Sequence, residues 1–555
     1  MAGAQGRSER WVRALCAALA LVAVPLPMAG ASLWALQAGL NLSGWRALLA
    51  DPQTWHALAL SLVSGLGATA LTVTLTAWLL AHSHARPLWA RMASSLAPLL
   101  AVPHAAFAIG FVFLVAPSGW LLRALSPWLT SYTFPPPWST TQDPWALGLA
   151  AVLVVKEIPF LLWAAATQLH RPDVASTWTR QWLVARSMGY APSTAWWRVV
   201  WPQLWPRLTL PALAVLAYNL TVVDVALVIG PTSPPTLGVL AWQWLMDADP
   251  VRYVQGVAAA WLLAATLAVS AWVGWYVSAH RFFARNRTAG VRGHKASGPS
   301  RHLQPAAWAW ITLLLMYGSV MLALVLGSVS GVWAFPNLLP ETLSWQAWQS
   351  VLMSSQTLST TVALGLASSL VAWAWAILWL ECLPASWDHR LSPLISLPLV
   401  LPAVLWVVGL HALALRWQLD ASLAGVYLAH TLMVAPYVLM TLRPAYAGFD
   451  ERYRHVSASM GHGYLVFLWW IKWPLLRSSL AASLAVGFAV SVAQYLPTLF
   501  VGAGRVNTIT TEAVTLAAGA QRSLTSAYAW LQWLLPVLGF ALAQRAGRPR
   551  RCKAP

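Results

Sequence analysis

The chain consists of long apolar stretches separated by short polar or charged segments. Twelve of the stretches approach or exceed the length of about 20 residues that an α-helix needs to cross a bilayer. A membrane offers the backbone no hydrogen bonds, so each stretch should be helical, and the short alternating pattern of a membrane barrel is absent. The pattern predicts an all-α polytopic membrane protein with about 12 transmembrane helices. We expect them at 11–36, 56–82, 93–116, 145–168, 204–230, 255–280, 306–332, 355–380, 393–415, 421–442, 476–502 and 524–544.

Two polar segments within this apolar chain repeat each other. Ser-Met-Gly at 187–189 recurs at 459–461, and Trp-Pro at 201–202 recurs at 473–474, so both motifs return at one constant offset. Eight of the 24 aligned positions around these motifs are identical. Because six expected spans fall in each half, both halves enter the membrane from the same side, which predicts a parallel 6+6 duplication.

The duplication predicts a division of the chain into two repeats. We place the first repeat at 1–280, a basic linker at 281–305 and the second repeat at 306–555. The first repeated segment is 183–202 and the second repeated segment is 455–474. Each lies in the polar interval before the fifth expected span of its half.

The basic residues predict the orientation. Of the 34 Lys and Arg residues, 27 fall on the side that holds both termini, the linker and both repeated segments, and six fall on the other side. The positive-inside rule makes the richer side cytoplasmic. Only 9% of the residues are charged, against about 25% in soluble domains. The net charge of +19 therefore reports orientation and contact with anionic lipid, and a nucleic-acid partner is unnecessary.

The N-terminal apolar run has two interpretations. Basic residues precede it, and Ala-Gly-Ala at 29–31 resembles the cleavage site of a secretory signal peptide. We favour an uncleaved first span, because the run is long enough for a full crossing. The three cysteines, Cys16, Cys382 and Cys552, are scattered, so the sequence predicts neither a metal site nor a disulfide framework.

Each repeated segment is expected to form two short helices joined at a glycine. Gly189 and Gly461 can adopt the positive φ that a sharp turn requires. Large apolar residues follow at i, i+3 spacing and predict one apolar helix face, and a proline then marks the start of the next span. These residues are Trp196, Val199 and Pro202 in the first segment and Leu468, Ile471 and Pro474 in the second. Interfacial anchoring would also explain the tryptophans, whereas two copies at one spacing favour docking of a two-fold partner.

These features resemble the EAA loop of permease subunits in binding-protein-dependent ABC importers. That loop has E-A-A-x-x-x-G, an apolar residue seven positions after the glycine, an aliphatic residue ten after it, and a final Leu-Pro. Both segments keep the glycine, both apolar positions and the proline. Leu183 and His455 stand in place of the glutamate, and Trp201 and Trp473 replace the leucine. Over the whole chain, the duplicated arrangement resembles fused permeases of the thiamine and ferric-iron importer group.

The resemblance implies a type I importer (MetI-like) fold that is not itself an enzyme. It implies two ATP-binding cassette subunits and an external or periplasmic solute-binding protein as partners, in a bacterial inner membrane. The sequence contains no Gly-x-x-x-x-Gly-Lys-Ser/Thr motif, so ATP and Mg would bind to the partner subunits and this chain would hold no cofactor. Thiamine is the first expected substrate and ferric iron the second. The residues expected to couple to the ATPase are Ala185, Ser187, Met188, Gly189, Trp196, Val199, Pro202, Ser457, Ser459, Met460, Gly461, Leu468, Ile471 and Pro474.

Lys156, Glu157, Asp224 and Gln494 lie at membrane depth within the expected spans. Glu157, Asp224 and Gln494 are candidates for the substrate pathway, because polar groups inside a membrane are costly and usually face the bundle interior or water. A polar contact between packed helices is the alternative. Lys156 and Glu157 point about 100° apart on a helix, so each is expected to contact another helix, beside a break at Pro159.

Two other functions compete with an ATP-driven permease. A 6+6 secondary transporter shares the parallel duplication, but 82–91 lacks the Gly-x-x-x-Asp-Arg pattern of the major facilitator group. A membrane enzyme would need clustered His or acidic residues, and the 13 histidines are dispersed. The Pro- and Trp-rich outer loops at 117–144 and 231–254 fit either a docking rim for a binding protein or interfacial anchors.

Overall fold

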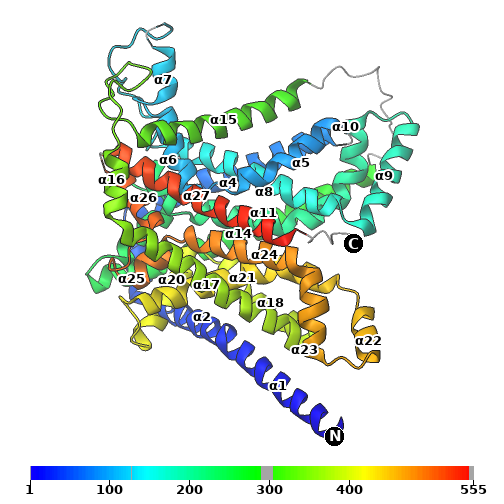
Figure 1. The fold of residues 1–555 in the computed structure, drawn as a ribbon. Helices are drawn as coiled ribbons and strands as arrows, with labels where there is room; N and C mark the ends of the chain where they lie inside the picture. The colour runs from blue at the N-terminus through cyan, green and yellow to red at the C-terminus, as the bar shows by residue number, and fades with distance from the viewer. Residues whose placement is uncertain (1, 85, 127, 289–303, 520, 549–555) are drawn as a thin grey trace. The chain divides into compact units, whose positions relative to one another are not determined.

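The computed structural model describes residues 2–84, 86–126, 128–288, 304–519 and 521–548, and α-helices dominate them (Figure 1). The chain forms two compact units. Unit 1 comprises 1–40, 349–515 and 531–555, and unit 2 comprises 41–348 and 516–530. Most of the predicted linker, 289–303, lies outside the described residues, as does Cys552.

Unit 2 contains the helices of the first half and one long helix from the second. α4 packs on α8 and α11, and α6 packs on α12 and α15. The helices are α3 (Leu42–Ala50), α4 (Gln53–Ser83), α5 (Pro87–Leu100), α6 (His104–Val115), α7 (Trp120–Leu125), α8 (Leu147–Leu169), α9 (Pro172–Ser187), α10 (Pro192–Ala195), the π-helix η1 (Trp196–Val200), α11 (Trp201–Thr221), α12 (Asp224–Ile229), α13 (Leu237–Leu245), α14 (Pro250–Thr288) and α15 (Gln304–Ser328).

Unit 1 combines the N-terminal helices with the second half. α17 packs on α21 and α24, which also pack on each other. The helices are α1 (Ala2–Ala23), α2 (Pro25–Gly39), α17 (Ser355–Cys382), α18 (Ala385–Ile395), α19 (Leu397–Val400), α20 (Ala403–Arg416), α21 (Leu423–Ala447), α22 (Arg452–Ser459), α23 (Tyr464–Phe467), the π-helix η3 (Leu468–Lys472), α24 (Trp473–Val492), α25 (Leu496–Gly502) and α26 (Ile509–Ala517). Three of the described helices cross the boundaries between the units, namely α16 (Gln346–Met353), α26 with its last two residues, and α27 (Arg522–Gly547).

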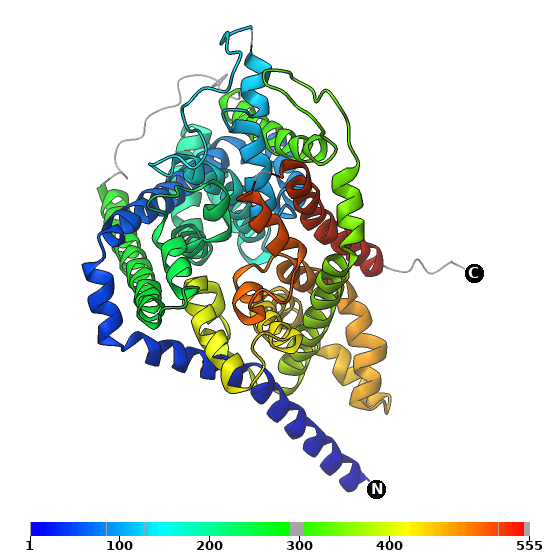
Figure 2. The ribbon, with the colours of Figure 1, turned by 90° about the vertical axis from the view of Figure 1, so that its left-hand side faces the viewer.

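The first long helix of each predicted repeat packs in the unit of the other half. α2 lies against α20 (Figure 2), and the backbones approach so closely that a Cβ at Gly409 would overlap the Ala31 carbonyl oxygen. In unit 2, a Cβ at Gly110 of α6 would lie 2.8 Å from the Val320 carbonyl oxygen of α15. The compact units therefore do not follow the repeat boundaries at 280 and 306, which remain a prediction about the duplication.

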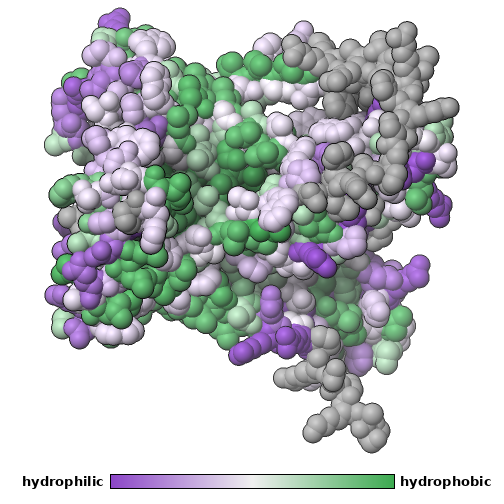
Figure 3. All heavy atoms as spheres, turned by 90° about the horizontal axis from the view of Figure 1, so that it is seen from above, coloured by the Kyte–Doolittle hydropathy of each residue, from purple (hydrophilic) through white to green (hydrophobic). Residues whose placement is uncertain are grey.

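Ten helices are long and apolar enough to cross a membrane, and the described residues contain up to eleven such spans if α18–α20, bent by 110°, counts as one. The expected span at 204–230 is not among them. It divides at 222–223 into α11 and α12. Apolar side chains form patches on the face that Figure 3 shows. In α14, Val269 and Trp272 are each 60% exposed, which suits contact with lipid.

The secondary structure repeats in the same register as the sequence. Five consecutive elements recur at the offset that separates the two Ser-Met-Gly motifs, so the fifth expected span of each half breaks at matching positions. The pairs of starting residues are Pro192 and Tyr464, Trp196 and Leu468, Trp201 and Trp473, Asp224 and Leu496, and Leu237 and Ile509. The last pair is capped alike, since Ser61 Oγ accepts from the Leu237 N–H and Thr361 Oγ1 accepts from the Ile509 N–H, both at 2.9 Å.

Candidate functional site: the repeated segments and the polar residues within the spans

Both repeated segments turn at a glycine of positive φ, as the sequence predicts. Gly189 has φ 91° and Gly461 has φ 79°. The next N–H, of Tyr190, bonds to the Ala185 carbonyl, and that of Gly189 bonds to the Arg186 carbonyl. His462 and Gly461 make the matching bonds to the carbonyls of residues 457 and 458. Each turn is therefore a Schellman motif, which closes the C-terminus of α9 or α22 with a left-handed residue.

A π-helical turn follows each glycine turn. In the first segment, the Trp201 N–H bonds to the Trp196 carbonyl five residues back, and Trp473 bonds to Leu468 in the same way. Pro202 has no N–H to donate and its ring would crowd the carbonyl four residues earlier, so the wider turn accommodates it. As expected, the proline lies at the start of the next helix, since Pro202 is the second residue of α11 and Pro474 the second residue of α24, although α10, η1 and α11 follow one another without interruption.

The apolar residues expected to meet a partner are buried within the chain. Trp196 is 1% exposed and Leu468 is 6% exposed, while Val199 and Ile471 are half-buried. The i, i+3 spacing does mark a helix face, but that face packs against the chain's own spans. Ala185 and Ser457 are buried as well, Pro202 is half-buried and Pro474 is exposed. Trp196 and Leu468 thus pack within the chain, and their contact with an ATPase stays a prediction.

A different set of apolar side chains is exposed on both segments. Val184, Met188 and Trp197 are 58, 71 and 41% exposed, and the identical residues Val456, Met460 and Trp469 are 58, 68 and 64% exposed. We call each set an exposed apolar triplet. Ser187 and Ser459, also exposed, bond to their own helix through the carbonyls of residues 184 and 456, both at 2.8 Å. The sequence-based prediction of the coupling residues included the two methionines but not the valines and tryptophans. Those valines and tryptophans are identical in the two repeats, and this identity could have identified them.

The two segments are attached differently to their spans. In unit 2, the Trp196 indole packs on His84, the residue that ends α4, with ring centroids 4.6 Å apart. In unit 1, Glu381 Oε2, near the end of α17, lies 2.9 Å from the Lys472 ammonium and accepts from the Tyr464 hydroxyl at 2.7 Å. The first attachment is aromatic and the second is an ion pair.

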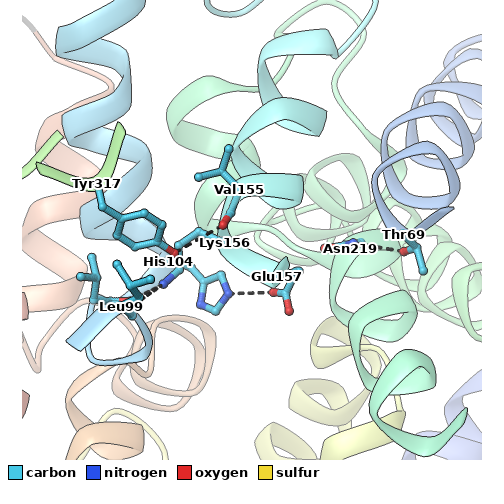
Figure 4. Close-up of polar contacts among 9 residues, drawn as sticks. Thr69, Leu99, His104, Val155, Lys156, Glu157, Asn219 and Tyr317 are labelled. Carbon is cyan, nitrogen blue, oxygen red and sulfur yellow. Dashed lines mark hydrogen bonds and ion pairs between the residues drawn. The ribbon is translucent and has the colours of Figure 1, made fainter. Parts of the chain in front are cut away.

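Glu157 in unit 2 pairs with a histidine that the sequence reasoning did not single out. Its Oε1 lies 2.9 Å from Nε2 of His104, the first residue of α6 (Figure 4). The Tyr218 ring packs on the imidazole at 4.5 Å. Asp224 begins α12, which packs against both α6 and α8, so this half-buried carboxylate belongs to the same part of unit 2. His104 is 35% exposed and Glu157 only 6%.

Lys156 contacts other helices, as its position beside Glu157 predicts. Its ammonium donates to the Val102 carbonyl at 2.6 Å and lies 5.9 Å from the ring centroid of Phe107. It lies 5.5 Å from the ring centroid of Tyr317, which Figure 4 shows beside it. Val102 lies between α5 and α6, so Lys156 satisfies a carbonyl that the interruption leaves free. The break expected at Pro159 is absent, because α8 continues through it to Leu169.

Gln494 lies at the interruption between α24 and α25 and is half-buried. One turn earlier, Ser491 takes part in a buried network that sequence reasoning missed. His430 Nδ1 lies 2.8 Å from Ser491 Oγ, and Nε2 lies 2.8 Å from Thr498 Oγ1. A histidine in the middle of an apolar helix was the available signal. In unit 2 the Asn219 amide donates to Thr69 Oγ1 at 3.1 Å, also just before the break in the fifth expected span (Figure 4).

One outer loop is held by an arginine. Arg123 donates to the carbonyls of Ala334 and Asn337 at 2.7 and 2.8 Å, and its guanidinium lies over the Trp333 ring. The loop at 128–145 exposes Trp128 at 88% and Phe134 at 79%. These contacts are compatible with both roles expected for the outer loops, a docking rim for a binding protein and a set of interfacial anchors.

The chain is polytopic and helical, and a helix–turn–helix is duplicated before the fifth expected span of each half. These features indicate a membrane permease. The chain belongs to the permease subunits of ABC transporters, as a fused two-permease subunit of an importer. It is 34% identical over 521 residues, 93% of each chain, to the inner membrane ABC transporter permease protein YnjC of Escherichia coli. No protein-family model matches the chain.

Two other relatives match about a third of this chain and are also described as transport permeases. Over 213 residues the chain is 26% identical to the thiamine transport system permease protein ThiP of Brucella abortus, covering 35% of this chain and 37% of ThiP. Over 208 residues it is 28% identical to a probable molybdenum ABC transporter permease of Haloferax volcanii, covering 36% of this chain and 75% of that protein. These relatives are transport permeases, and the chain is accordingly a multi-pass inner-membrane protein.

Proposed function

We propose that this chain forms the translocation pathway of an importer and is driven by two ATP-binding subunits that dock on the two repeated segments. The observation that carries the proposal is the pair of exposed apolar triplets, identical in residue type and placed beside the same Schellman turn in both units. Exposed apolar side chains on the two helical segments that flank the glycine turn suit insertion into a groove. Two copies suit the two equivalent sites of a dimeric ATPase.

The glycine turn and the π-turn give each segment a defined shape without a glutamate at the EAA position. Leu183 and His455, which differ between the two repeats, occupy that position. Docking on this chain would then depend on apolar contact. ATP and Mg would bind to the partner subunits, and a solute-binding protein would deliver the substrate from the outer face.

Co-purification tests the docking proposal. The full chain, expressed with its candidate ATP-binding subunits, should retain them, whereas Met188→Ser with Met460→Ser should lose them. The matched control is Leu183→Ser, an exposed apolar residue of α9 that has a histidine at the repeated position. Retention of the ATPase by the double variant would contradict docking through the triplets. Transport that persists without any ATPase would favour a 6+6 secondary transporter.

For the substrate, we propose a small cationic solute, with thiamine first and ferric iron second. Glu157 and Asp224 place two carboxyl groups in one part of unit 2, whereas Lys156 directs its ammonium to a carbonyl and two rings. Carboxylates attract cations and disfavour oxyanions. The relatives' names include thiamine and molybdenum. Thiamine is a cation and molybdate is an oxyanion, so the charge of the solute distinguishes the two substrate classes.

Uptake into cells or proteoliposomes tests the substrate class. Labelled thiamine, ferric iron and molybdate are compared with the wild type, Glu157→Gln and Asp224→Asn. Cation uptake should fall several-fold in both variants, and molybdate should not be transported. Molybdate uptake by the wild type that the two variants leave unchanged would contradict a cationic substrate.

A further inference from the structure

One carboxylate oxygen ties both ends of a short helix in unit 1 to α17. Glu381 Oε2 accepts from the Tyr464 hydroxyl at 2.7 Å and lies 2.9 Å from the Lys472 ammonium. Tyr464 is the first residue of α23 and Lys472 is the last residue of η3. Residues 464–472, within the second repeated segment, are therefore held at both ends by the side chain of one residue near the C-terminus of α17.

The tie is buried and charged. The side chains of Glu381 and Lys472 are 6 and 9% exposed. The ammonium also lies 4.5 Å from the centre of the Tyr446 ring and 5.6 Å from that of Phe449, both beyond the segment. Separating a buried pair leaves each charge without compensation, so the segment should resist movement away from α17.

The same helix presents apolar side chains on its other side. Leu465, Trp469 and Trp470 are 70, 64 and 79% exposed, between the two tied ends. A partner pressing on these side chains would act on a helix whose opposite side is fixed to Glu381. Force on the segment would then reach α17 directly.

α17 continues from this tie to contacts at its other end. Ser368 Oγ donates to Ser491 Oγ at 3.0 Å, near the end of α24, and Thr361 Oγ1 accepts from the Ile509 N–H that begins α26. α17 is a continuous helix of 28 residues. A shift at Glu381 is thus passed along one rigid element to the interruption between α24 and α25 and to α26.

Unit 2 lacks this arrangement among its described residues. The end of α4 meets the first repeated segment through the His84–Trp196 ring contact. Burial, together with repulsion from His170, lowers the pKa of His84 to about 4, so the imidazole is neutral near pH 7. Among the described residues, the buried ion pair that joins a repeated segment to a span, Glu381–Lys472, is accordingly found in the second half.

We propose that Glu381 is a positioning residue that makes the second repeated segment and α17 move as one body, so that the two halves respond unequally to the ATPase. The proposal rests on the proposed docking function, which it deepens by naming the link between the docking segment and a span.

The test separates a mechanical role from simple stabilisation. Glu381→Gln keeps an acceptor for Tyr464 but leaves Lys472 unpaired. Glu381→Gln with Lys472→Met removes both charges, so no buried charge is stranded and stability should return. Glu451→Gln, which changes an exposed carboxylate in the same loop, is the matched control. Each full-length variant is co-purified with the ATP-binding subunits and its hydrogen exchange is followed with and without ATP.

In the wild type and in Glu451→Gln, ATP should change the exchange of 464–472 and of 509–517 together. In the double variant, the change at 464–472 should persist while that at 509–517 falls several-fold, at an unchanged melting temperature. An undiminished response at 509–517 in a stable double variant would overturn the proposal. A second arm without ATPase or ATP asks whether 464–472 exchanges faster in the double variant than in Glu451→Gln, and equal rates would overturn the tie itself. A wild type that binds no ATPase would contradict the proposed function, and the second arm would still decide whether Glu381 holds the segment.

Discussion

The indole of Trp196 packs on the imidazole of His84, with ring centroids 4.6 Å apart. His84 ends α4 and Trp196 begins the π-helical turn of the first repeated segment, so the contact joins a span to the segment that we propose as a docking site. It also shows that this apolar residue of the EAA pattern packs against a helix of its own chain. Trp196 anchors the segment to its own chain, and the residue beside it, Trp197, is exposed.

The His84 contact should make stability depend on pH. Burial, with repulsion from His170, lowers the folded pKa of His84 from 6.5 to about 4. The stabilisation is therefore complete above pH 6.5 and is lost as the pH falls toward 4, because the unfolded chain takes up the proton first. Between pH 8 and pH 5 the loss is about 2 kcal/mol.

The measurement is the melting temperature in detergent at the two pH values. His84→Gln should flatten the dependence, and His455→Gln, at an exposed position on α22, should preserve it. An equal slope in the wild type and in His84→Gln would show that another group carries the effect.

The glycine turns should not tolerate a side chain. Gly461→Ala places a Cβ at φ 79°, where no atom lies within 4 Å, so the cost is backbone strain alone, about 1 to 2 kcal/mol. Gly463→Ala has the same open surroundings but an ordinary negative φ, and should cost much less. Chemical or thermal unfolding of the two variants gives the comparison, and equal losses would contradict the role of φ.

Removing one exposed tryptophan should weaken docking more than it weakens folding. Trp469→Ser deletes a side chain that is 64% exposed, so the free chain should lose little stability, while binding of an ATP-binding subunit should fall about tenfold. Leu183→Ser, outside the triplets, should leave the affinity near that of the wild type. Titration of the ATPase against the chain in nanodiscs measures both, and equal affinities for the two variants would exclude Trp469 from the contact.

Lys156 should matter for stability even if it never meets the substrate. Lys156→Met removes the donor to the Val102 carbonyl, in a buried site between α5 and α6, at an expected cost of about 1 to 3 kcal/mol. Glu157→Gln keeps a polar partner for His104 and should unfold nearly as the wild type does. If Glu157→Gln lost as much stability as Lys156→Met, the contact with His104 would be mainly structural.

Several features were predictable because they depend on local pattern. Spans follow from the length of apolar runs, and the constant offset of the sequence repeat reappears in the starts of five elements. The left-handed turns follow from glycine, which adopts positive φ without strain. Prolines were less consistent, because α8 runs through Pro159, whereas Pro202 lies in the first turn of α11, directly after a π-helical turn.

The candidate pathway residues show what a local sequence pattern cannot predict. Glu157 and Asp224 were recognisable as polar residues in apolar spans, but their neighbours were not. His104 is 53 positions before Glu157 along the chain, and no periodicity connects them. The same holds for Glu381 and Lys472, which are 91 positions apart.

By itself, the sequence determined the membrane-spanning helical class, the duplication and the shape of the two repeated segments, since hydropathy, glycine and proline act over a few residues. The tertiary structure alone decided which face of each segment is exposed, which span holds it and by what chemistry. It also decided that the first long helix of each predicted repeat packs in the unit of the other half. These outcomes depend on contacts between residues tens to hundreds of positions apart, and such contacts leave no periodic trace in the chain.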